Sequence, residues 1–196
     1  MAIQPVEQLA QDLHYVREAV ETSRTVQYRS VAIPVLWAGV IAVGLALNDF
    51  CQTSTVGWYW AVAAPVVGML SGWLGMRAER SAGVQSDRKH RARQALHWLT
   101  ILAGFIVVVV ITTTHGLDGR LVGQLMTLIF GIVYFLGGLH LDGRFLWPGL
   151  AAIAGSAAID HLGPYSWTIV GVVIAAALVA SALWTKGSHA QAPTQG

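Results

Sequence analysis

The chain has 196 residues, of which 55% are apolar and 11% are charged, and its mean hydropathy is +0.56. A soluble domain needs a charged surface, so this composition excludes an ordinary soluble fold and leaves an apolar excess that must face lipid. The small net charge of +2 disfavours nucleic-acid binding, and the single cysteine, Cys51, excludes an intrachain disulfide, a CxxC redox pair and a cysteine-rich zinc site.

Residues 1–30 are predicted to form a cytoplasmic segment that carries an amphipathic helix. Its apolar residues recur in alternating steps of three and four, and Pro5 suits a first helical turn. A cleavable signal peptide is not expected, because acidic residues interrupt the segment and it has no central apolar run. The apolar stripe needs a partner, which is the membrane surface, the helical bundle or another protein. The predicted partner-binding residues are Val6, Leu9, Leu13, Val16 and Val20.

Six apolar segments follow within residues 31–184, and most are close to the ~20 residues that cross a hydrocarbon core of ~30 Å. They are 31–47, 57–76, 95–114, 121–139, 145–159 and 165–184. The fifth is short, so it must snorkel through Arg144 and Asp160, thin the bilayer or be shielded by its neighbours. Its many small residues favour a shielded, central position. We therefore predict an all-α, polytopic integral membrane bundle of six transmembrane helices, arranged as three in-out-in hairpins.

The basic residues predict the orientation of these spans. With the N-terminus inside, the cytoplasmic segments contain Arg17, Arg24, Arg29, Arg77, Arg80, Arg88, Lys89, Arg91, Arg93, Arg144 and Lys186. Only Arg120 is left outside, as the positive-inside rule requires. Both termini are therefore expected in the cytoplasm, with residues 185–196 as a disordered tail. The excess of Arg over Lys, together with abundant Ala and Gly, is typical of the coding bias of a bacterium of high GC content, and we expect the protein in a bacterial inner membrane.

Motifs of soluble enzymes are missing from the sequence. It contains no Walker loop, no HExxH, no GxSxG elbow and no dinucleotide fingerprint. The interiors of the predicted spans contain no ionisable residue, whereas membrane enzymes and ion-coupled transporters usually need one. Gln124 is the most conspicuous buried polar group, and we interpret its amide as a hydrogen-bonding contact between helices.

Acids and histidines gather at the predicted outer ends of the helices. Five of them are candidate ligands for a divalent metal ion: Asp49, His115, Asp118, Asp160 and His161. The three aspartates each end the first helix of a hairpin, so a bundle with rough pseudo-symmetry would bring them together. No pair has the spacing that fixes two ligands on one helix face, however, and helix capping explains polar residues at these positions without a metal.

At the inner side, His97 opens the third span and His140 closes the fourth, so they are candidate axial ligands of a haem. Both lie at the membrane interface, whereas a membrane haem lies within the hydrocarbon, and we expect no cofactor. The basic segment from Arg77 to Arg93 is predicted to bind anionic lipid headgroups and to fix the topology. The two Leu-Asp-Gly-Arg runs, 117–120 and 141–144, are interpreted as tight turns.

Two classes of function fit these features. The preferred hypothesis is a non-enzymatic accessory, scaffolding or regulatory subunit that binds a protein partner or forms a homo-oligomer. The alternative is an oligomeric transporter or channel for a small solute, and a haem or quinone redox subunit is the third interpretation.

Overall fold

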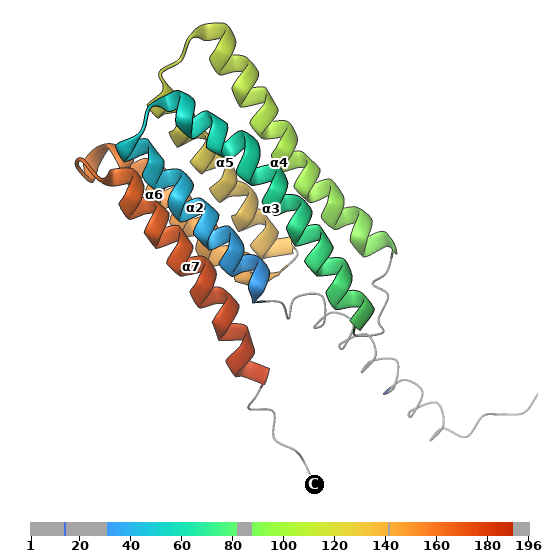
Figure 1. Cartoon of the computed structure of the whole chain (residues 1–196). Helices are drawn as coiled ribbons and strands as arrows, with labels where there is room; N and C mark the ends of the chain where they lie inside the picture. The colour runs from blue at the N-terminus through green and yellow to red at the C-terminus, as the bar shows by residue number, and fades with distance from the viewer. Residues whose placement is uncertain (1–13, 15–30, 82–87, 141, 190–196) are drawn as a thin grey trace, which may run out of the picture.

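The computed structural model describes His14 and residues 31–81, 88–140 and 142–189, and every regular element within these ranges is helical (Figure 1). The long helices are α2 (Ala32–Phe50), α3 (Thr53–Ser81), α4 (Arg88–His115), α5 (Gly119–His140) and α7 (Ser166–His189). The shorter α6 (Leu146–Ala158) is flanked by the 3-10 helices η1 (Gly143–Phe145) and η2 (Ile159–His161). The predicted all-α class is confirmed. The N-terminal stripe Val6, Leu9, Leu13, Val16 and Val20 lies outside the described residues.

Helix ends follow local chemistry. The backbone of Cys51 is extended and ends α2, and the side-chain amide of Asn48 donates to the carbonyl oxygens of Gly44 and Leu45 in its last turns. Gly116 has a φ of 60° directly after α4, a conformation that glycine adopts without a steric penalty at the C-terminal end of a helix.

Several helices run past the predicted ends of their spans. Helix α4 begins at Arg88, before the third apolar segment, because a span boundary marks the hydrocarbon and does not stop the helix. Helix α7 continues to His189, so residues 185–189, which were predicted to belong to a disordered tail, are helical. Lysine is a good helix former, and the first glycine of this segment, residue 187, lies near the helix end where its cost is small.

The helices pack in the order α3, α2, α7, α6, α5 and α4, with each helix touching the next. The closest packing joins α2 with α7 and α5 with α6, so the α6–α7 hairpin is in the middle of this packing order. The core combines residues of α2, α5, α6 and α7, among them Ile41, Tyr134, Ala152, Ile174 and Leu178. The predicted central position of the fifth apolar segment agrees with this arrangement.

Glycines allow the backbones of α5 and α6 to touch. A Cβ atom added to Gly131 would lie 2.7 Å from the backbone nitrogen of Ile153, and one added to Gly138 would lie 2.5 Å from that of Leu146. Gly149 of α6 faces the backbone of Phe135 in the same way. Close approach through small residues is the usual basis of helix association in membranes, where the hydrophobic effect contributes little.

Within residues 31–81, 88–140 and 142–189, five helices are long and apolar enough to cross a membrane: Ala32–Phe50, Thr53–Ala78, Ala95–Thr112, Gly119–His140 and Ser166–Trp184. Their burial within the bundle differs widely. In α7, 39% of the most apolar stretch is buried, but in α3 and in α4 only 6% is. Helices α3 and α4 thus present most of their apolar side chains outward.

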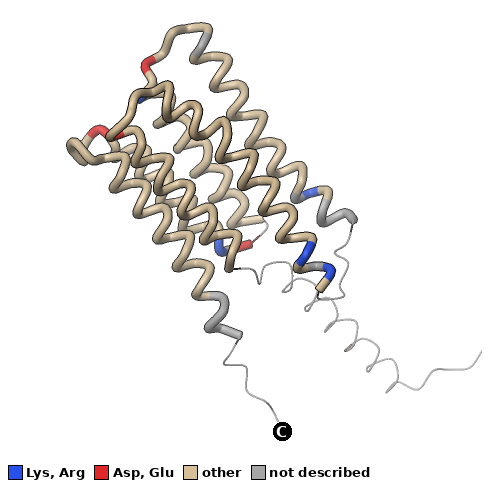
Figure 2. The backbone as a smooth tube through the Cα atoms, in the orientation of Figure 1, with Lys and Arg blue, Asp and Glu red and all other residues tan. Residues whose placement is uncertain are grey.

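The described Lys, Arg, Asp and Glu side chains lie at the two ends of the bundle (Figure 2). One end, here called the basic end, carries Arg77, Arg80, Arg93, Arg144 and Asp142. The other, here called the acidic end, carries Asp49, Asp118, Asp160 and Arg120. An apolar belt therefore separates two charged rims, as expected of helices that cross a hydrocarbon layer.

Candidate functional site

The polar groups of the acidic end lie where the turns of the three hairpins meet. Glycines make this meeting possible, because a Cβ atom on Gly119 would lie 2.6 Å from a methyl group of Thr53. One helical turn deeper, a Cβ atom on Gly123 would lie 2.6 Å from the distal edge of the Trp167 ring. The first turn of α5 is thereby pressed against the starts of both α3 and α7.

Asp49, near the end of α2, caps α7. Its Oδ2 atom accepts hydrogen bonds from the backbone nitrogen of Thr168 at 2.7 Å and from the hydroxyl of the same residue at 2.6 Å. The first turn of a helix has backbone N–H groups without partners inside the helix. A carboxylate accepts hydrogen bonds from them, and its negative charge is attracted by the positive end of the helix dipole. The contact joins the first hairpin to the third.

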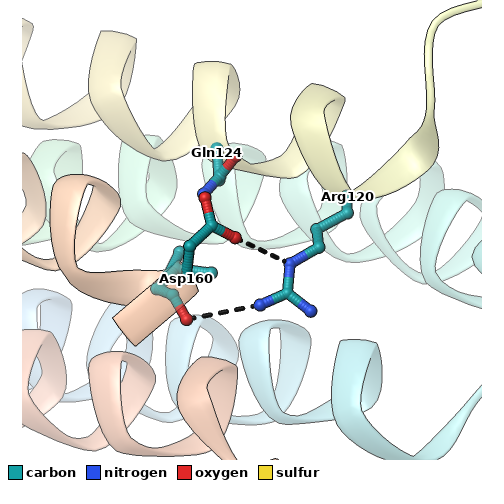
Figure 3. A network of polar contacts seen from close by, with 4 residues as sticks. Arg120, Gln124 and Asp160 are labelled. Carbon is teal, nitrogen blue, oxygen red and sulfur yellow. Dashed lines mark hydrogen bonds and ion pairs between the residues drawn. The ribbon is translucent and has the colours of Figure 1, made fainter. Parts of the chain in front are cut away.

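Asp160, in η2, joins α6 to α5 (Figure 3). Its carboxylate accepts from Nε of Arg120 at 3.0 Å and from the side-chain amide of Gln124 at 2.7 Å. Arg120 also donates to the carbonyl oxygen of Ile159, and the hydroxyl of Ser156 donates to the backbone oxygen of Gln124. The hydrogen bond from the Gln124 amide has the largest effect on the pKa of Asp160, and together with the Arg120 guanidinium it lowers this pKa below its usual value by stabilising the ionised carboxylate. Burial acts in the opposite direction but has the smaller effect.

An open pocket of about 270 Å³ lies between these contacts. Its lining comes from all three hairpins: Asn48, Asp49, Cys51, Thr53, Val56, Asp118, Gly119, Arg120, Pro164 and Trp167. The lining therefore includes two aspartates, one arginine and the buried Trp167.

The five candidate metal ligands have separate surroundings. Asp49 and Asp118 line the pocket, whereas Asp160 is bound to Arg120 and Gln124. His115, the last residue of α4, and His161, in η2, are exposed. Within residues 31–81, 88–140 and 142–189, no three His, Cys, Asp or Glu side chains lie close enough to hold a metal ion. The acidic end thus contains all five residues, but two of its three aspartates, Asp49 and Asp160, already accept hydrogen bonds from protein groups.

At the basic end, His97 packs against α5: its Nε2 atom would lie 3.0 Å from a Cβ atom on Gly137. Its ring meets Trp98 edge to face at a centroid distance of 5.6 Å, and His140 is exposed at the last residue of α5. The space between α4, α5 and η1 is filled by aromatic rings: Trp98, Phe130, Tyr134 and Phe145, with neighbouring centroids 4.1 to 6.2 Å apart. Aromatic side chains therefore pack against one another in the region of the candidate haem ligand His97.

The turn interpretation holds for the second Leu-Asp-Gly-Arg run. Asp142 accepts from the backbone nitrogen of Arg144 at 3.0 Å and from its Nε at 2.8 Å, which closes the turn before η1. Nearby at the basic end, the Arg77 guanidinium lies over the Trp73 ring at 5.4 Å from its centroid. Lipid binding by the segment from Arg77 to Arg93 stays a prediction.

Two important residues of the acidic end had no recognisable signal in the sequence. Thr168 is one of several hydroxyls near span ends, and nothing marks it as the partner of Asp49. Trp167 is only 3% exposed, whereas its sequence position at the start of a span is typical of an interfacial tryptophan. Knowing which helix ends are neighbours would have identified both.

The regular structure of the described part of the chain is entirely helical, and five of its helices are long and apolar enough to cross a membrane. No protein-family profile, curated protein or solved structure matches the chain.

Proposed function

We propose that the protein is a non-enzymatic accessory or scaffolding subunit of a bacterial inner membrane, with six spans and both termini in the cytoplasm. The observation that carries this proposal is the outward face of α3, which has the small residues of a helix-packing surface but is covered by no other helix among the described residues.

The separation of charge supports the orientation. Three arginines of the basic end, Arg77, Arg80 and Arg93, flank the connection between α3 and α4, and Arg144 precedes α6. The acidic end has one arginine, Arg120, which is bound to Asp160. Because basic residues near spans are retained on the cytoplasmic side, the basic end is assigned to the cytoplasm.

The continuity of the helical segments around α6 supports a sixth span. Helix α6 alone has 13 residues, fewer than a span needs, but η1 precedes it and η2 follows it without a break. The combined segment connects Arg144 at the basic end with Asp160 at the acidic end. Its packing between α5 and α7 buries one side of the segment, so its short apolar length carries a smaller cost.

The face of α3 supports the role in binding a partner. Gly68, Gly72 and Gly75 follow one another at steps of four and three, on one side of the helix, and a Cβ atom at any of them would meet nothing within 4 Å. Glycine costs a helix about 1 kcal/mol relative to alanine, and some helical glycines of the chain, such as Gly131 and Gly149, offset this cost by close packing. A helix of another membrane protein packed on α3 would provide the same compensation.

Two further contacts belong to this proposal. The stripe Val6, Leu9, Leu13, Val16 and Val20 would bind the cytoplasmic part of the partner or the membrane surface beside it. The basic segment from Arg77 to Arg93, directly after the glycine face, would hold anionic headgroups at the same end.

Photocrosslinking from defined positions tests the assignment of α3. In a Cys51→Ser background, single cysteines at Met69 and Met76 of α3, and at Val172 and Leu183 of α7, are labelled with a benzophenone maleimide in membranes and irradiated. All four positions are exposed. We expect a discrete heavier protein adduct from the two α3 positions only, because lipid surrounds the two α7 positions.

Glycine variants supply the matched control. Gly72→Leu fills the face of α3 and should abolish the adduct formed from Met69→Cys. Gly39→Leu, on α2, should preserve it, since that glycine also has open space but lies on another helix. Equal adducts from α3 and α7, or an adduct that survives Gly72→Leu, would contradict the proposal.

A further inference from the structure

The wall of the acidic-end pocket includes a buried indole whose N–H has no acceptor among the described protein groups. Trp167 lines the pocket and is only 3% exposed, and within the described ranges its indole N–H donates to no protein group. Its distal ring edge is held against Gly123 of α5, which fixes the ring. A buried N–H without an acceptor is unfavourable, so a molecule in the pocket that reaches this donor would gain a hydrogen bond.

A second donor of the pocket is partly free. Arg120 uses Nε for Asp160 and Nη2 for the carbonyl oxygen of Ile159, and its other terminal nitrogen has no partner within the described residues (Figure 3). The two bonds hold the guanidinium in place while leaving this edge available. A carboxylate is the small group that best suits a guanidinium edge and an indole N–H together.

Acceptors lie in the same pocket. The Asp118 side chain is exposed and makes no hydrogen bond or ion pair with another described side chain. Asp49 uses Oδ2 for Thr168, and its Oδ1 has no partner in the described part of the chain. Two carboxylates with free oxygens provide a place for an ammonium group.

From these groups we propose that the pocket binds a small zwitterion of the amino-acid class. The carboxylate of the ligand lies on Arg120 and the Trp167 N–H, and its ammonium group lies on Asp118 and Asp49. The volume of about 270 Å³ is close to the lower limit of ~300 Å³ for ligand pockets, which restricts the ligand to a small molecule. This binding is separate from partner binding by α3, and on the proposed topology the pocket opens to the outer side of the membrane.

Thermal unfolding of the full chain in mild detergent tests the proposal with three probes: glycine, sodium acetate and methylammonium chloride. Glycine carries both charged groups, and each of the other probes carries one. A ligand that binds only the folded state raises the unfolding midpoint. We expect glycine to raise the midpoint in a saturable way, and acetate and methylammonium at equal concentration to have much smaller effects.

Variants separate binding from the general stabilising effect of glycine as a solute. Asp118→Asn removes one charge from an exposed side chain and should weaken the apparent affinity for glycine about tenfold or more. His161→Gln, also exposed at the acidic end but outside the pocket lining, should leave the affinity unchanged. Equal midpoint rises in the wild type and Asp118→Asn would overturn the proposal, as would acetate or methylammonium matching glycine.

Discussion

Gly149→Leu is expected to lower the free energy of unfolding by about 3 kcal/mol or more, the upper part of the range for overpacking. A Cβ atom at this position would lie 2.7 Å from Cα of Phe135 and 2.9 Å from the carbonyl oxygen of Gly131. Both neighbours are backbone atoms of α5, which cannot move aside as a flexible side chain can. The variant must therefore separate α5 from α6, the contact that holds the second hairpin to the third.

Unfolding of purified protein in mixed micelles with increasing SDS measures this change. Gly39→Leu is the matched control, because it makes the same substitution in α2 at a position where a Cβ atom meets nothing within 4 Å. The control should unfold at or above the wild-type SDS fraction, since leucine is the better helix former. If both variants unfolded at the same SDS fraction, the close approach of α5 and α6 would be wrong.

Asp49→Ala is expected to destabilise the bundle by about 2 kcal/mol, the upper end of the range for loss of an N-cap. The change removes the acceptor of both the backbone N–H and the hydroxyl of Thr168, in the first turn of α7. Since α7 contributes more to the core than any other span, fraying of its first turn should weaken the packing of α2 on α7.

The same SDS titration tests this cap with two comparisons. Asp118→Ala removes an aspartate that has no described side-chain partner, so its effect should stay within about 0.5 kcal/mol. Asp49→Asn retains a side-chain oxygen and should keep much of the stability, because Asn and Asp are similar caps. An Asp49→Ala protein as stable as Asp118→Ala would show that the cap contributes nothing measurable.

The helices and the central position of the α6 segment could be predicted because both depend on local composition. A run of apolar residues predicts a helix in a bilayer whatever surrounds it, and the small residues of 145–159 indicate close neighbours. The helix ends were less predictable. Apolar runs mark the hydrocarbon, and helices such as α4 and α7 extend past it into polar sequence.

The contacts of the acidic end depend on which helices are neighbours, and the sequence does not reveal that. Asp49 and Thr168 are 119 residues apart, and their contact requires α2 to lie beside α7. Gln124 was predicted to join helices, but its partners Asp160 and Ser156 follow only from the packing of α5 on α6. The three aspartates at the hairpin ends therefore have different roles. Asp49 caps α7, Asp160 forms an ion pair with Arg120, and Asp118 lines the pocket.

The six-span topology is the claim on which the functional proposals depend, and cysteine labelling in intact cells tests it most directly. Single cysteines are placed at Thr53, Ser86 and Gly187 in the Cys51→Ser background and treated with a membrane-impermeant maleimide, with lysed cells as the control for reactivity. We predict that intact cells are labelled at Thr53 only, and that lysed cells are labelled at all three positions. Labelling at Gly187 in intact cells would mean that the segment around α6 does not cross the membrane, and labelling at Ser86 would reverse the orientation.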